Sequence, residues 1–115
     1  MPSKSPFNAL GDIADNIALA RTFVEGLSFE AFVEDRRTVY AVTRCLEIIS
    51  EASRRLPPDL KARHPHIPWV KMAGAGSVYR HDYEEVLERF LWLTLLDLDP
   101  LRIAVAAELE RLTKK

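Results

Sequence analysis

The segment DRRTVYAVTRCLEIISEASRRL, residues 35–56, decides the fold class of this chain. Apolar residues recur in it every three or four positions, a spacing that places them on one face of a helix. Pro57 and Pro58 follow at once, and a residue that precedes proline is disfavoured in a helix. The segment therefore predicts a long helix from about Asp35 to Leu56. Its main stripe is Val39, Val42, Leu46, Ile49, Ser53 and Leu56, and a second stripe, Ala41, Cys45, Ile48 and Ala52, widens the buried face.

A first helix is expected before this segment. Ser5-Pro6 is typical of an N-cap followed by the first helical residue. Gly26 followed by Leu27 indicates the C-terminal cap. A short helical piece, 29–33, should follow with Ser28 as its cap. The apolar stripe of the first helix is Leu10, Ile13, Ile17, Ala20 and Val24.

Three more helices are expected after the segment. A proline-punctuated connector, 57–69, should hold one helical turn at 59–64. A third helix begins near Pro68 and ends around the glycines 74 and 76, a fourth runs over 82–98, and a last one opens at Asp99-Pro100 and reaches Leu112. No stretch alternates at period two, so the predicted class is all-α. The expected architecture is an up-and-down bundle of four to five helices in a single domain, 1–115.

Composition excludes several classes of function. The 115 residues carry 16 basic and 17 acidic side chains, a formal net charge of -1, so RNA contact would depend on a local patch. The single cysteine, Cys45, excludes an internal disulfide and a Cys-rich zinc site, which favours a reducing, cytoplasmic location. The N-terminus lacks the pattern of a signal peptide, and the longest apolar run, 90–96, is too short to span a bilayer.

The predicted fourth helix is apolar on more than one face. Such a helix must be covered on all sides, which a domain of this size can hardly do with its own helices. We therefore favour a homodimer interface at this helix over a central core helix. The residues concerned are Val86, Leu87, Phe90, Leu91, Trp92, Leu93, Leu95, Leu96 and Leu98.

The stretch GAGSVYRHDY, residues 74–83, holds the clearest candidate for chemistry. It places His81 beside Arg80, Asp82 and two tyrosines. Histidine changes its charge near neutral pH and can transfer protons in the cleavage of a phosphate ester. His64 and His66 have no evident third ligand, so neither a metal site nor a cofactor is expected. Their alternative role is in a connector that packs Trp69 inward.

Several motifs together resemble the HepT-like toxins of the HEPN superfamily. They are Glu47-Ile48-Ile49-Ser50-Glu51-Ala52, the run 64–69 with Ile67-Pro68-Trp69, Ala73-Gly74, and His81-Asp82-Tyr83. The resemblance implies an all-α homodimer and metal-independent RNA cleavage. It also implies a minimal nucleotidyltransferase antitoxin as partner, which in some systems transfers AMP to the motif tyrosine.

The resemblance carries over only in part. The family motif is an arginine, four to six residues, then His-x-Tyr. His81 and Tyr83 match its second half, which makes His81 catalytic and Tyr83 the AMP acceptor. The arginine half is unmatched, because Gly76-Ser77 stands where an arginine-asparagine pair is usual. We therefore expect weakened cleavage, with Arg80 as the nearest replacement cation.

Asp82 and an arginine of the long helix are expected to support the site. Asp82 can cap the fourth helix and hold His81. Arg44, or Arg37, could reach across the dimer toward His81, although a solvated helix face is the simpler interpretation. The alternative functions are a catalytically inactive dimeric partner or AMPylation substrate of the nucleotidyltransferase, and a plain helical scaffold.

Overall fold

The structure is a computed structural model that describes residues 5–81 and 84–114, with the backbone alone over 76–81 and 84–86. The described residues are all-α, as the sequence predicts, and form seven helices and no strand. Five of the helices are long and two are single short pieces. Their bounds are α1 (Phe7–Val24), α2 (Phe29–Glu34), α3 (Arg36–Arg54), α4 (Pro58–Ala62), α5 (Trp69–His81), α6 (Glu84–Leu96) and α7 (Asp99–Thr113).

The helix boundaries follow local capping interactions. Ser28 Oγ accepts from the Ala31 amide at 3.1 Å at the start of α2, as predicted. Asp35 Oδ1 accepts from the Thr38 amide at 3.2 Å at the start of α3. After α1, Gly26 has a φ of 80°, a conformation that glycine adopts without steric cost. The Leu27 amide then donates to the Val24 carbonyl at 2.9 Å, which completes the predicted cap.

Two predicted N-caps are displaced by one residue. Pro6, not Ser5, is the N-cap of α1, and Ser5 Oγ accepts from the Phe7 amide at 3.2 Å. Asp99 is the first residue of α7 rather than its cap. Its carboxylate binds Arg21 at 2.6 Å, and this ion pair, with that of Arg102, lowers the pKa of Asp99. The Asp99 carboxylate thus binds Arg21 of α1 and does not cap α7.

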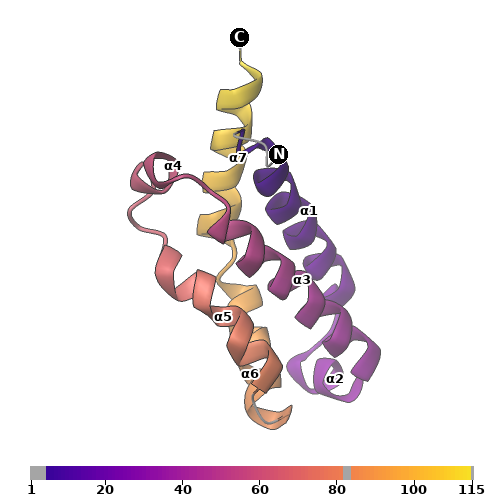
Figure 1. Cartoon of the computed structure of the whole chain (residues 1–115). Coiled ribbons are helices and arrows are strands. Elements are labelled where there is room, and N and C mark those ends of the chain that lie inside the picture. The colour runs from indigo at the N-terminus through magenta and orange to yellow at the C-terminus, as the bar shows by residue number, and fades with distance from the viewer. Residues whose placement is uncertain (1–4, 82–83, 115) are drawn as a thin grey trace.

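The predicted long helix forms the centre of the bundle. α1 packs along α3, α7 packs against α1, and α5 packs along the other side of α3, while α6 continues from α5 toward α7 (Figure 1). The stripe residues Val42, Leu46 and Ile49 are buried, and burial raises the pKa of the Cys45 thiol. The core also takes in α1 through Leu10, Ile13 and Ile17.

α6 contributes apolar side chains both to the core and to the surface. Leu91, Leu95 and Leu98, just past its end, are buried, and Trp92 packs against Phe32 with ring centroids 5.3 Å apart. Among the described side chains of α6, Leu93 is 58% exposed and Leu96 is 69% exposed. The short helix α2 supplies part of this cover, because Phe29 also lies against Trp92, with ring centroids 5.8 Å apart.

The expected turn at the glycines is wrong, because α5 runs through Gly74 and Gly76 to His81. Each glycine costs an isolated helix about 1 kcal/mol relative to alanine. Contacts with α3 offset that cost, because Ser50 of α3 donates to two carbonyl groups of α5. The fourth predicted helix corresponds to α6, which is described from Glu84, while its predicted first residue, Asp82, lies outside the described residues. None of the helices over 5–81 and 84–114 combines the length and apolar character that a bilayer crossing requires.

Candidate functional site

α5 carries four of the candidate site residues on one continuous backbone helix, namely Gly76, Ser77, Arg80 and His81. Positions four apart on a helix share a face. Position 80 therefore lies one turn beyond position 76, and position 81 lies one turn beyond position 77. Asp82 and Tyr83, two further predicted site residues, lie outside the described residues. Position 80 therefore lies on the same helix face as Gly76, which stands where the family motif has its arginine.

The start of α5 is anchored by Trp69. Its indole Nε1 donates to the carbonyl oxygens of Lys61 at 3.1 Å and His64 at 3.0 Å, at the end of α4 and just beyond it. The half-buried ring packs against the core. The predicted role of the connector, to pack Trp69 inward, is confirmed. The connector therefore fixes where the motif-bearing helix begins.

His64 belongs to a partly buried polar cluster around Glu108. Its Nε2 lies 2.7 Å from Oε2 of Glu108, a residue that is 5% exposed on α7. The Arg63 guanidinium binds the same carboxylate, and these bonds lower the pKa of Glu108 to about 2, against the opposing effect of burial. The His66 ring lies 6.0 Å from that of His64. Over the residues that the structure describes, no group of three possible metal ligands occurs.

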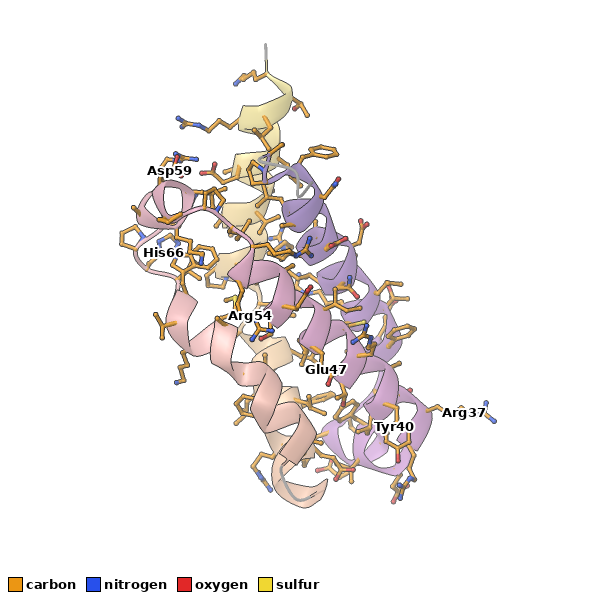
Figure 2. The ribbon with its side chains drawn as sticks, in the orientation of Figure 1. Arg37, Tyr40, Glu47, Arg54, Asp59 and His66 are labelled. Atoms are coloured by element: carbon orange, nitrogen blue, oxygen red, sulfur yellow. The ribbon has the colours of Figure 1, made fainter. Side chains whose placement is uncertain are left out.

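Two side chains of α3 contact the backbone of α5. Ser50 Oγ donates to the carbonyl oxygens of Met72 at 2.9 Å and Ala73 at 3.1 Å. Arg54 Nη1 donates to the Ala73 carbonyl at 3.2 Å, and Figure 2 shows Arg54 between the two helices. Sequence reasoning overlooked both residues. The sequence does contain one indication of the role of Ser50, since its hydroxyl directly follows the apolar Ile48 and Ile49. A hydroxyl buried at such a position requires a hydrogen-bond partner.

Arg44 lies on the outer surface of α3. Its Nη1 is 3.7 Å from Oε1 of Glu47, three residues further along the helix. The Arg44 side chain is 71% exposed, and such a pair contributes little to stability. On the same helix, Glu51 pairs with Arg55 at 3.4 Å. Arg44 is therefore extended into solvent and able to meet a charged partner.

A shallow pocket occurs at the other end of the bundle. It lies between the beginning of α1 and the end of α7, with Phe7, Gly11, Asp15 and Leu109 among its lining residues. The end of α5 lies toward the opposite pole of the molecule (Figure 1). The pocket therefore does not include the predicted site residues.

A family model described as "Ribonuclease HepT-like" matches residues 13–107, from α1 to the middle of α7 and across the whole of α5. The chain belongs to the HepT-like family.

Curated relatives of this HepT-like protein agree with that assignment. A protein named "Probable ribonuclease HepT" from Thermococcus cleftensis is 41% identical over 91% of this chain and 93% of its own length. "Putative RNase MJ1216" from Methanocaldococcus jannaschii is 33% identical over 82% of this chain and 78% of its own. No solved structure matches the chain. Both relatives are named for RNA cleavage. Each of the two matches covers most of this chain.

Proposed function

We propose that this protein is a metal-independent endoribonuclease, and the toxin of a pair with a nucleotidyltransferase antitoxin. Membership of the HepT-like family carries the proposal, because its model spans the stretch with His81 and Tyr83. The names of the two relatives support RNA as the substrate. The retained His-x-Tyr half of the motif supports proton-transfer chemistry at this stretch.

The proposed reaction is attack of an RNA 2′-hydroxyl on the adjacent phosphate. One His81 removes the hydroxyl proton, the P–O5′ bond breaks, and the His81 of a second subunit protonates the leaving oxygen. General acid–base catalysis of this kind is typically worth about 10²–10⁴-fold in rate. The transition state also needs positive charge, usually the largest electrostatic contribution. Arg80 is proposed to supply it, since position 80 follows position 76 by one helical turn.

RNA cleavage in the presence of EDTA tests the function. Wild type should cut RNA at the same rate with and without chelator, and His81→Ala should abolish cutting. His66→Ala is the matched control, because it removes a histidine from the exposed connector. Loss of activity on chelation, or equal rates for His81→Ala and wild type, would contradict the mechanism.

A homodimer is part of the proposal. Two subunits would bring two copies of the motif together, as the division of roles between two histidines requires. The exposed side chains of Leu93 and Leu96 on α6 offer apolar surface for this contact. Arg44, exposed on α3, would supply a further cation from the partner subunit.

A second candidate function is an inactive dimeric binding module that serves as partner or AMPylation substrate of the transferase. Gly76 in place of the motif arginine favours it, because the usual source of charge stabilisation is absent. Complex formation with the transferase, combined with no RNA cleavage by wild type at any protein concentration, would support this candidate over the first.

A further inference from the structure

Ser50 is a buried hydroxyl in the middle of α3. It is 2% exposed and lies among apolar neighbours such as Leu46 and Ile49. A hydroxyl removed from water in this way destabilises the fold unless it finds a hydrogen-bond partner. Ser50 finds its partners on another helix, at the carbonyl oxygens of Met72 and Ala73.

These two carbonyl groups belong to the interior of α5. In an α-helix they also accept from the amides of residues 76 and 77, and a carbonyl oxygen has a second lone pair for another donor. Arg54, one turn after Ser50 on α3, adds a bond to Ala73. Two consecutive turns of α3 therefore hold one point on the α5 backbone.

α5 depends on such bonds more than its neighbours do. Over 69–75, the part with described side chains, no residue is fully buried, and Val70, Lys71 and Gly74 are exposed. Half-buried apolar contacts tolerate sliding of one helix along another. Hydrogen bonds do not, because they weaken steeply with distance and angle. The Trp69 indole bonds hold the first residue of α5, and the bonds from Ser50 and Arg54 hold its middle at a defined axial position along α3.

The axial position of α5 decides where its last turn lies. His81 follows Ala73 by eight residues, or about 12 Å along a helix. We propose that Ser50 and Arg54 are positioning residues, which fix the last turn of α5 and so the place of His81. The inference rests on the proposed function for the role of His81, and on the geometry of α3 and α5 for the rest.

Ser53→Ala is a matched control for Ser50→Ala. Ser53 is 1% exposed on the same helix, and its Oγ donates within α3, to the Ser50 carbonyl at 2.7 Å. The two substitutions remove the same atom from equally buried sites. They differ in whether the lost bond crosses to α5. Arg54→Met removes the second donor at an exposed position and keeps an aliphatic stem.

Amide hydrogen exchange tests the positioning directly. Ser50→Ala and Arg54→Met should speed exchange over residues 76–81 by about tenfold, the equivalent of one lost hydrogen bond. Exchange over α1 in the same proteins should stay unchanged, because a general loss of stability would speed both helices. Ser53→Ala should alter neither. Equal exchange over 76–81 in wild type, Ser50→Ala and Arg54→Met would overturn the proposal.

RNA cleavage supplies the second readout. Ser50→Ala should lower kcat by about 10- to 100-fold at unchanged KM, because misplacing a reacting group affects chemistry more than binding. A fall in cleavage without faster exchange over 76–81 would also overturn the positioning role. If wild type cuts no RNA, the proposed function fails, and the exchange comparison still decides whether Ser50 and Arg54 hold α5.

Discussion

The guanidinium of Arg63 and the carboxylate of Glu108 form a two-point contact, with Nε to Oε2 at 3.1 Å and Nη2 to Oε1 at 2.8 Å. The two residues are 45 positions apart, and the contact ties the end of α4 to α7. His64 binds the same carboxylate from the next position and also accepts from the Trp69 indole through its carbonyl. The cluster thus connects α7 to the beginning of the motif-bearing helix.

Glu108 should make the stability of the fold depend on acid pH. Its pKa is about 2 in the folded protein against an ordinary 4.5, so its contribution is complete above about pH 4.5 and is lost as pH falls toward 2. Glu108→Gln should lower the free energy of unfolding by on the order of 2 kcal/mol at pH 7, less than the whole shift implies because Arg63 is partly exposed. Urea denaturation of both proteins from pH 7 to pH 3 measures the difference, which should shrink with acid.

Glu110→Gln is the control for this prediction. Glu110 lies two residues further on α7, is exposed, and pairs with Lys114 at 3.5 Å. Its substitution should change the free energy of unfolding by less than about 0.5 kcal/mol. A pH-independent difference between wild type and Glu108→Gln would show that the carboxylate is not the ionised partner in the cluster.

Restoring the arginine of the motif should raise RNA cleavage. Gly76 is helical, so an arginine fits the backbone there, and Gly76→Arg should increase cleavage by about 10²-fold through charge stabilisation. Gly76→Ala separates charge from helix propensity, because both variants should stabilise the helix by about 0.5–1 kcal/mol and only one adds a cation. Initial rates on RNA and melting curves provide both quantities. Equal rates for the two variants would show that Arg80 or another cation already fills the role.

The exposed leucines of α6 should hold a homodimer together. Light scattering at micromolar concentration should give twice the chain mass of 13.1 kDa. Leu93→Lys combined with Leu96→Lys should yield the single-chain mass, because each would place a charge in an apolar contact. Val70→Lys on α5 is the control, as Val70 is also strongly exposed. A monomeric wild type would contradict the dimer outright.

Tyr83 should accept AMP from the partner transferase. The phenol oxygen attacks the α-phosphate of ATP, pyrophosphate leaves, and His81 takes the phenol proton, with magnesium supplied by the transferase site. The added phosphate would repel RNA. Intact mass after incubation with the transferase, ATP and magnesium should rise by the mass of AMP in wild type and in Tyr40→Phe, whose phenol is exposed on α3. Labelling that persists in Tyr83→Phe would assign the acceptor elsewhere, with Tyr79 the next candidate.

The sequence by itself determined the elements whose causes are local. The spacing of Val42, Leu46 and Ile49 was sufficient for the central helix, because one helical face must leave water whatever packs on it. Ser28 and Gly26 marked helix ends for the same reason, since a cap acts within three residues of itself. The His81-Asp82-Tyr83 motif was likewise readable, because it is contiguous in the chain.

The tertiary structure alone decided the path of α5 and the cover of α6. Local propensity favours a turn at Gly74 and Gly76, but bonds from Ser50 and packing on α3 outweigh a helix cost of about 1 kcal/mol per glycine. Asp99 likewise does not act as a helix cap, because its carboxylate binds Arg21, 78 residues away. These outcomes depend on groups that only folding brings together, and the free energy of such contacts exceeds the small local preferences that a sequence displays.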